Sequence, residues 1–343
     1  MVLAMSGAFP GAAIHTSLYD PAGTFPEFRS LDVRTSVIDR LGPLRSRHRL
    51  ALPVLAPVFS AMRVDAEVAV CSSSGWAHGA AVTGRKVVYC HNPARWLYQP
   101  DRYLAGFSGV AGAAMSTLRP ALERWDKRAA RSADRYLANS TVVRDRIRQT
   151  YGIDAEILPP PIAIDPGGPQ AEVPGLDPGY LLCVSRLLAY KNVGAVVAAF
   201  ARLPEQRLVV VGTGPLAGEL AAAAGPNVTF TGEVSDPTLR WLYHHAAGLV
   251  AASYEDFGLT PLEAAAYGKP TAALRWGGYL DTVEDGTTGV FFEQPSVDDI
   301  AGAVSVLASK AWDPDVLVAH AGRFSTARFT ARLREVVGEV AAQ

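Results

Sequence analysis

The stretch Gly248-Leu-Val-Ala-Ala-Ser-Tyr-Glu-Asp-Phe-Gly-Leu-Thr-Pro-Leu-Glu263 decides the interpretation of the fold. It opens with an apolar run typical of a buried strand and continues into a loop that contains Glu255. Thr260 is expected to cap the helix that carries Glu263, with Pro261 at the first helical position. An apolar strand followed by a loop and a helix is typical of parallel α/β sheets.

The same stretch predicts a ligand site at the end of the strand. Gly258 allows the backbone to approach a ligand closely, and the N–H groups of a helix N-terminus suit phosphate. The carboxylates of Glu255 and Glu263 can each accept hydrogen bonds from sugar hydroxyl groups. An ordinary capped helix with two surface glutamates is the alternative, and this stretch alone leaves it open.

Apolar runs and helical patterns alternate through the rest of the chain, which predicts an α/β protein with Rossmann-like sheets. Strands are predicted at 12–17, 33–37, 67–71, 87–90, 135–138, 180–184, 207–211, 228–230, 248–251, 270–273 and 290–292. Helices are predicted at 193–202, 216–224, 238–245, 260–267 and 297–307, with an amphipathic helix at about 330–340.

A Pro- and Gly-rich stretch at 158–175 divides the chain and is typical of a linker or hinge. A chain of 343 residues is long enough for two domains. We predict an N-terminal Rossmann-like domain at 1–170, joined by a C-terminal helix at about 322–343, and a second at 171–321. Ligands bind such sheets at the carboxyl ends of the strands, which we expect to line a cleft between the domains.

Charge is distributed unevenly along a chain whose net charge is -1. Residues 1–170 hold 20 Lys and Arg against 14 Asp and Glu, whereas residues 171–343 hold 12 against 19. A basic first half suggests an anionic partner there, such as a phospholipid or a diphosphate-linked acceptor, and no nucleic acid is expected. Chance variation of the surface is the alternative. Hydrophobic residues make up 49%, which argues against a disordered or fibrous protein.

The cysteines and the apolar stretches indicate the cellular compartment. Cys71, Cys90 and Cys183 lie in apolar runs without metal-ligand spacing, so we expect buried free thiols in a reducing compartment. No signal peptide is expected, and the apolar stretch 50–62 is too short to span a bilayer. The protein is therefore expected to be cytoplasmic.

A basic arm at 40–49 precedes this apolar stretch. A basic segment beside an apolar one predicts peripheral contact, through 40–62, with an anionic membrane surface at the inner membrane face. A buried helix with a charged entry is the alternative.

Ser185-Arg-Leu-Leu-Ala-Tyr-Lys-Asn192 follows the predicted strand 180–184 and places two cations at its end. Arg186 and Lys191 can clamp a diphosphate, and they would stabilise the negative charge that grows on it as a sugar leaves. A solvated helix end is the alternative, although cations are unfavourable at a helix N-terminus. Because no Asp-x-Asp motif or histidine ligand pattern is found, we expect these cations to replace a metal ion and no cofactor to be needed.

Two weaker signals lie elsewhere. Gly212-Thr-Gly-Pro215 follows the strand 207–211, but many strand-to-helix turns have this pattern. His91, in Tyr89-Cys-His-Asn-Pro93, ends a first-half strand and is expected to project into the cleft. A histidine satisfied by its neighbours at a strand end is the alternative.

Together these motifs resemble the family-four retaining glycosyltransferases, which have the GT-B fold. The family's two glutamates stand as Glu255 and Glu263, and its Ser-Arg-x-x-x-x-Lys-Asn clamp stands as Ser185 to Asn192. Gly212-x-Gly214-Pro215, Phe230-x-Gly232 and Gly277-Gly278…Asp285-Gly286-x-x-Gly289 also follow the family order. Segments 8–16, 90–97 and 136–140 resemble the branch that contains O-antigen mannosyltransferases.

The resemblance implies a transferase that moves a mannose-like hexose from a nucleotide-diphosphate sugar to a lipid-linked or other glycan acceptor. It also implies two facing Rossmann-like domains and a C-terminal helix that crosses back to the first. Glu255 and His91 would contact the transferred sugar, and Glu263 would hold the ribose. The other residues implied in donor binding are Gly212 and Gly214, the base-pocket turn Gly232, Glu233 and Val234, and the backbone of Asp256, Phe257, Gly258 and Leu259.

The chain departs from this family at its first residues. Members of the branch usually begin with a strand and a Gly-rich loop that opens the first helix, whereas Met1-Val-Leu-Ala-Met5 matches the middle of that helix. Either the start of the chain is misassigned, or the first domain is built without this strand and loop. A degenerate, non-catalytic nucleotide-binding or partner subunit is the alternative function. The intact Glu255, Arg186 and Lys191 argue against it.

Overall fold

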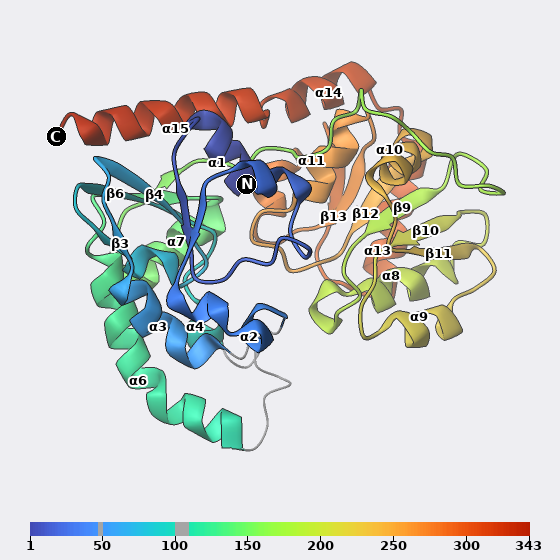
Figure 1. Ribbon diagram of the computed structural model, residues 1–343. Coiled ribbons are helices and arrows are strands. Elements are labelled where there is room, and N and C mark those ends of the chain that lie inside the picture. Colours follow the sequence, from blue (N-terminus) through green and yellow to red (C-terminus); the bar gives the residue numbers. More distant parts are fainter. Residues whose placement is uncertain (47–50, 100–109) are drawn as a thin grey trace. The chain divides into compact units, whose positions relative to one another are not determined.

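The computed structural model describes residues 1–46, 51–99 and 110–343 (Figure 1). The chain divides into two compact units. Unit 1 comprises Met1–Pro160 and Ala327–Gln343, and unit 2 comprises Pro161–Thr326. The sequence placed the boundary after residue 170, but residues 161–170 pack with unit 2.

Unit 2 is built on a parallel sheet of six strands. In spatial order these are β11 (Val228–Gly232), β10 (Leu208–Val211), β9 (Leu181–Val184), β12 (Gly248–Ala251), β13 (Thr271–Leu274) and β14 (Gly289–Phe292). The four central strands are almost wholly buried, as expected of apolar runs covered on both faces. The six strands confirm the predicted α/β fold of this half.

Helices cover both faces of this sheet (Figure 1). They are η5 (Ala189–Lys191), α8 (Val193–Phe200), α9 (Ala217–Ala223), α10 (Asp236–His245), α11 (Leu259–Ala266), α12 (Tyr279–Thr282), α13 (Val297–Ser309) and α14 (Pro314–Gly322). α8 packs against α13, and α11 packs against α14. The sequence did not predict α12 or α14.

Unit 1 holds a parallel sheet of four strands. In spatial order these are β4 (Val68–Ser73), β6 (Arg85–Cys90), β7 (Arg135–Ala138) and β8 (Glu156–Ile157). Two further parallel pairs are β1 (Ile14–Thr16) with β2 (Val33–Thr35) and β3 (Arg63–Val64) with β5 (Ala81–Val82). The two-residue strands β3, β5 and β8 were not predicted, because so short a segment has no alternating pattern.

The helices of unit 1 lie beside these sheets and include the first residues of the chain. They are α1 (Val2–Ala8), α2 (Gly42–Ser46), α3 (Leu52–Ala61), α4 (Arg95–Tyr98), α6 (Val110–Ala130) and α7 (Thr141–Tyr151), with η1 (Pro26–Ser30), η2 (Val37–Arg40) and η4 (Ala77–Gly79). Met5 and Ala8 of α1 are buried against the sheet, in agreement with the helix predicted there.

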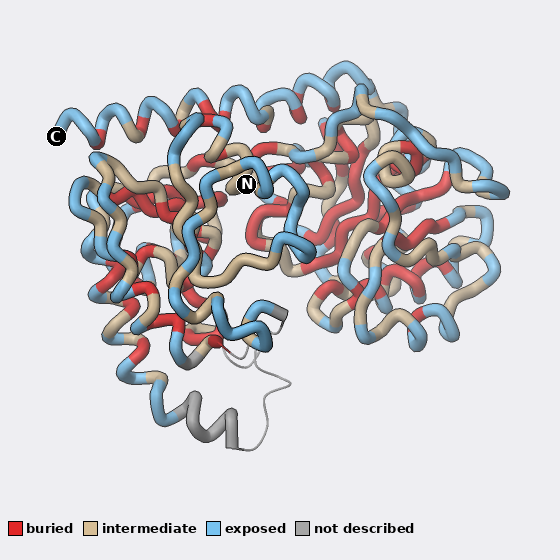
Figure 2. Tube along the Cα trace, in the orientation of Figure 1, coloured by how far each residue is buried: buried red, intermediate tan, exposed pale blue. Residues whose placement is uncertain are grey.

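The C-terminal helix α15 (Thr326–Ala341) packs on unit 1. Phe329, Leu333, Val336 and Val340 recur at helical spacing and are buried in one cluster with Tyr89 of β6. Figure 2 shows these buried positions along one side of the helix. The predicted return of the last helix to the first domain is confirmed.

The Pro- and Gly-rich stretch is packed against its neighbours. Tyr89 donates a hydrogen bond to the carbonyl of Leu158 over 2.9 Å. Beyond the unit boundary, Arg240 of α10 donates to the carbonyl of Asp165 over 3.0 Å. The N–H group of Ala171 donates to the carbonyl of Pro237 over 3.0 Å. The stretch therefore begins fixed to unit 1 and continues fixed to α10 of unit 2.

Within the apolar stretch 50–62, residues 52–61 form α3, whose inward face is buried in a cluster with Leu55 and Phe59. Val54 on the same helix is 40% exposed. Arg47 and Arg49 of the predicted basic arm lie outside the described residues. Within the described ranges, no helix is both long and apolar enough to cross a membrane. All three cysteines are buried and free, as predicted.

Candidate functional site

The strand order of unit 2 marks where a ligand would bind. From β9 the chain continues to β10 and β11 on one side, then returns to β12, β13 and β14 on the other. In open α/β sheets, ligands bind outside the carboxyl ends of the strands at such a switch point. The residues after β9 include Arg186 and Lys191, and those after β12 include Glu255.

Lys191 and Glu255 form an ion pair at this point. The ammonium Nζ of Lys191 donates to Oε1 of Glu255, and Lys191 is only 8% exposed. The same Nζ lies over the ring of Tyr190, 4.9 Å from its centroid. A buried lysine needs an opposite charge beside it. The two predicted residues, 64 positions apart, are therefore brought together.

Two hydrogen bonds join the loops that carry this pair. The side-chain amide of Asn192 donates to the carbonyl of Ala252 over 2.8 Å, and Ser253 donates to the carbonyl of Lys191 over 3.4 Å. Asn192 has a left-handed backbone with φ of 55°, which asparagine tolerates better than most residues. Sequence reasoning missed these contacts, although an asparagine before a helix was a signal for such a turn.

Arg186 lies at the same edge and is exposed. Its guanidinium donates a hydrogen bond to the hydroxyl of Tyr190 over 3.0 Å. Tyr190 therefore contacts both predicted cations, and its backbone carbonyl accepts a hydrogen bond from the N–H group of Tyr254 over 3.4 Å. The edge presents the exposed guanidinium of Arg186 beside the ion pair of Lys191 and the half-buried Glu255.

The helix α11 begins earlier than predicted. Gly258 is its N-cap residue, with φ of 85°, and no side chain caps the helix. The predicted capping by Thr260 is wrong because the left-handed turn at Gly258 starts the helix before it. A Cβ atom at Gly258 would meet the ring of Tyr279 at 2.5 Å. The first-turn N–H groups have no acceptor within the helix, and Asp256 and Phe257 before them are buried.

Glu263 lies farther along α11 and is half-buried. Its Oε2 accepts a hydrogen bond from the hydroxyl of Tyr243 over 2.7 Å. Burial raises the pKa of Glu263, whereas the hydrogen bond from Tyr243 lowers it. Leu259, the first residue of this helix, packs with the buried Phe257.

The predicted glycines differ in what the fold requires of them. A Cβ atom at Gly212 would meet the carbonyl oxygen of Ser185 at 2.1 Å, and one at Gly214 would meet that of Leu187 at 2.4 Å. Both glycines are therefore needed for the packing of two loops. The turn that begins with Gly232 has open space around it, an exposed Glu233 and a half-buried Val234.

His91 belongs to unit 1 and follows β6. Its Nε2 lies 2.9 Å from the hydroxyl of Ser72, and Asn139 donates to its backbone carbonyl over 3.2 Å. Burial lowers the pKa of His91 to about 4, and the positive charges of the Met1 amino group and Arg95 act in the same direction. The imidazole is therefore neutral at physiological pH.

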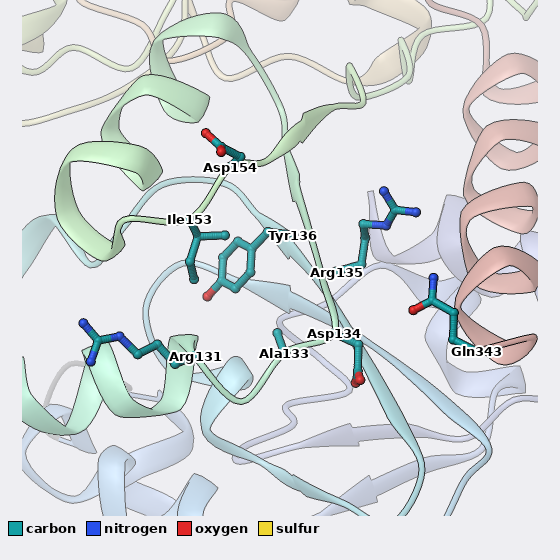
Figure 3. Close-up of a pocket in the computed structure, with 8 residues that line it drawn as sticks. All are labelled: Arg131, Ala133, Asp134, Arg135, Tyr136, Ile153, Asp154 and Gln343. Carbon is teal, nitrogen blue, oxygen red and sulfur yellow. The ribbon is translucent and has the colours of Figure 1, made fainter.

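A pocket of about 520 Å³ lies in unit 1 near the amino end of β7 (Figure 3). Its lining includes Arg131, Asp134, Arg135 and Tyr136 and contains none of the predicted site residues. The predicted site residues follow the carboxyl ends of strands instead. Among the described residues, no group of three or more His, Cys, Asp and Glu could hold a metal ion.

Two family models match the two halves of the chain. Residues 2–165 match Glycosyltransferase Family 4, and residues 169–315 match Glycosyl transferases group 1. Over the whole chain, the fold resembles the crystal structure of Anabaena Alr3699/HepE in complex with UDP. The TM-score is 0.70 at 17% identity, over 98% of this chain and 95% of that one.

Curated relatives match about half of this chain. The D-inositol 3-phosphate glycosyltransferase of Mycobacterium avium (strain 104) is 36% identical over 203 residues, which are 51% of this chain and 46% of the relative. The GDP-mannose-dependent alpha-(1-6)-phosphatidylinositol monomannoside mannosyltransferase of Mycolicibacterium smegmatis (strain ATCC 700084 / mc(2)155) is 31% identical over 212 residues, which are 53% and 54%. The chain thus spans about half the length of these relatives.

Proposed function

Because the chain belongs to the family-four glycosyltransferases of the GT-B fold, we propose that it moves a mannose-like hexose from a nucleotide-diphosphate sugar to a glycan acceptor. The acceptor hydroxyl is lipid-linked or part of another glycan, and the anomeric configuration is retained. The observation that carries this proposal is the ion pair between the buried Lys191 and the half-buried Glu255 at the switch point, with Arg186 at the same edge. A carboxylate beside two cations matches a sugar joined to a diphosphate.

The two cations bind the diphosphate. Arg186 offers a bidentate contact and Lys191 a point charge, and both stabilise the negative charge that develops as the sugar leaves. They do the work of a divalent metal, so transfer needs none. The acceptor hydroxyl attacks on the face from which the diphosphate departs, and a diphosphate oxygen takes its proton.

The carboxylates and the start of α11 bind the rest of the donor. Glu255 accepts hydrogen bonds from the sugar hydroxyls, and the N–H groups from Asp256 to Leu259 bind hydroxyls and phosphate. Glu263 accepts a hydrogen bond from the ribose. The turn from Gly232 to Val234 lines the base pocket.

The relatives suggest which donor to test first. The mannosyltransferase of M. smegmatis is GDP-mannose-dependent, and the Anabaena protein is in complex with UDP. We therefore propose GDP-mannose as the donor, and we test UDP-glucose beside it for comparison.

Turnover by this chain alone tests the proposal. The purified protein is incubated with GDP-mannose or UDP-glucose and glycan or polyprenyl-phosphate-linked acceptors, and the product is identified by mass spectrometry and NMR of its anomeric proton. We expect an α-linked product from an α-linked donor without added metal and in the presence of a chelator. A β-linked product, or activity that the chelator abolishes, would contradict the retaining, metal-independent mechanism.

We also propose that the segment 40–62 of unit 1 contacts an anionic membrane surface. Leu41 is 55% and Val54 is 40% exposed, and the exposed Arg40 lies beside Leu41. Arg45 is also exposed but lies 3.7 Å from Asp39, which neutralises part of its charge. Flotation with phosphatidylglycerol vesicles tests this. Binding that is lost in Arg40→Ala/Leu41→Ser is expected, and unchanged flotation of that variant would refute the contact.

A further inference from the structure

Tyr243 contacts Glu263, whose carboxylate we assign to binding of the ribose. It lies on α10, is 1% exposed, and its ring stacks on that of Tyr267 with centroids 5.5 Å apart and planes at 13°. Its hydroxyl donates to Oε2 of Glu263 over 2.7 Å. Burial also raises the pKa of Tyr243 well above 10, so the hydroxyl remains a donor.

This contact leaves one carboxylate oxygen for a ligand. Among the described residues, no hydrogen bond reaches Oε1 of Glu263, and that atom is not sealed from solvent. A carboxylate held through one oxygen has its second oxygen fixed in direction. The helix α10 follows directly on the turn Gly232–Val234, so Tyr243 links the helix after the assigned base pocket to the helix that carries Glu263.

We propose that Tyr243 is a positioning residue that orients Glu263 and so makes donor binding selective for a ribose with a 2′-hydroxyl group. This inference rests on the proposed function. Tyr243 does not touch the donor and acts through Glu263. Because Glu263 holds the ribose equally in the ground state and the transition state, the effect falls on KM for the donor and leaves kcat unchanged.

The hydrogen bond also favours the ionised form of Glu263. Tyr243 opposes the burial that raises the pKa of Glu263, whereas the negative charge of Asp236 on α10 acts with burial. Tyr267 also faces Glu263 and is itself influenced by Arg240 and Asp165. An ionised carboxylate binds the ribose, so donor affinity is lost as pH falls through the pKa of Glu263. Without the Tyr243 hydroxyl this loss occurs at higher pH.

The chain offers a matched control in the same stack. Tyr267 is stacked on Tyr243, and its buried hydroxyl has no hydrogen-bond partner among the described residues. Tyr243→Phe and Tyr267→Phe each delete one oxygen from this pair of rings. Only Tyr243→Phe removes the hydrogen bond to Glu263.

The experiment measures calorimetric affinity for UDP and GDP beside their 2′-deoxy forms, from about pH 8 to about pH 5. Y243F should bind the preferred ribonucleotide about 10-fold more weakly than the wild type and should lose the preference for ribose. Its affinity should also begin to fall at a higher pH than that of the wild type. Y267F should match the wild type. E263A should also lose the ribose preference, and adding Y243F to it should have no further effect.

The outcomes distinguish a failure of the proposed function from a failure of the role assigned to Tyr243. If the wild type binds neither UDP nor GDP, the proposed function fails and this inference fails with it. If the wild type binds one of them and Y243F behaves as Y267F does, the inference alone is overturned. Retention of the ribose preference by E263A would overturn it as well, even if Y243F proved too unstable to measure.

Discussion

Single residues at the switch point have different parts in donor binding. Glu255 is the partner of the buried Lys191, whereas Arg186 is exposed and, among the residues that the structure describes, donates to the hydroxyl of Tyr190. A neutral amide at position 255 can still accept a hydrogen bond from Lys191. Loss of the exposed guanidinium leaves the diphosphate with one cation. The two positions therefore affect the donor differently.

We predict that Glu255→Gln removes the extra affinity that the sugar gives a nucleotide-diphosphate sugar over its nucleoside diphosphate. Arg186→Ala should weaken binding of both ligands by about 10-fold to 100-fold, because a charge-assisted hydrogen bond is lost. Isothermal titration calorimetry with GDP and GDP-mannose measures both effects. Normal turnover by Glu255→Gln would refute the assigned role of Glu255.

His91 makes folding depend on pH in a defined direction. Its pKa is about 4 in the folded state, whereas an unfolded histidine titrates near pH 6.5. Between these values the unfolded chain binds the proton and the folded chain does not. The free energy of unfolding should therefore fall as pH is lowered from about 6.5 to about 4, by on the order of 3 kcal/mol. Above about pH 6.5 this contribution is constant.

The matched measurement compares denaturant unfolding of the wild type and His91→Gln across this range. The glutamine side chain does not titrate, so the difference between the two curves isolates His91 from the carboxylates. We expect the wild type to lose stability more steeply with acid. Parallel curves would show that His91 titrates near its ordinary pKa.

At the scale of elements, the entry to α11 depends on a glycine. Gly258 has φ of 85°, and an added Cβ atom would meet Tyr279 at 2.5 Å. Gly302 in the middle of α13 has no atom within 4 Å of its added Cβ and is the matched control. Gly258→Ala should lower stability by about 1–3 kcal/mol and weaken donor binding, whereas Gly302→Ala should raise stability by about 0.5–1 kcal/mol.

Thermal denaturation with and without GDP measures both variants. A Gly258→Ala protein as stable as Gly302→Ala would show that the left-handed turn is not needed at the start of α11.

Local signals predicted the strands of both units except the two-residue strands β3, β5 and β8, and they predicted the glutamates after β12 and the cations after β9. Apolar runs and turn residues act over a few positions, so they can be read from the chain directly. The bonds between Tyr243 and Glu263 and between Asn192 and Ala252 join residues 20 and 60 positions apart, and no periodicity indicates them. The capping residue of α11 was misplaced for a local reason, because Gly258 and Thr260 compete for the same turn.

Sequence reasoning also missed a buried polar network in unit 1, because its residues lie far apart in the sequence. His78 lies between Ser73, 2.8 Å away, and Asp126, 3.0 Å away. The hydroxyls of Tyr98 and Tyr151 donate to the same carboxylate of Asp126 over 2.8 and 2.7 Å. These contacts fix α6 to η4, α4 and α7, and in the sequence the same residues are scattered over separate segments.

At the scale of the whole molecule, the last helix completes the first unit. Leu333 of α15 is fully buried in the cluster that contains Tyr89, whereas Val337 only packs against its rim. Leu333→Ala should destabilise unit 1 by about 2–5 kcal/mol, and Val337→Ala should cost less because it leaves a smaller cavity. Affinity for a nucleoside diphosphate should be unchanged in both variants, because the assigned nucleotide residues lie in unit 2.

Differential scanning calorimetry resolves this effect, since two compact units need not unfold in one transition. We expect Leu333→Ala to shift the transition that GDP does not stabilise. A shift confined to the GDP-stabilised transition would show that α15 stabilises unit 2 and not unit 1.

We propose that unit 2 binds a nucleotide-diphosphate sugar through Arg186, Lys191 and Glu255. Thermal melting of the wild type with UDP, GDP, ADP, dTDP and their common sugars tests it most directly. A ligand at 100 times its Kd stabilises the folded state by about 2.7 kcal/mol, which raises Tm by several degrees. We expect such a rise with GDP or UDP and the corresponding sugar, and no rise in Lys191→Met. Flat melts across the panel, or an equal rise in Lys191→Met, would contradict it.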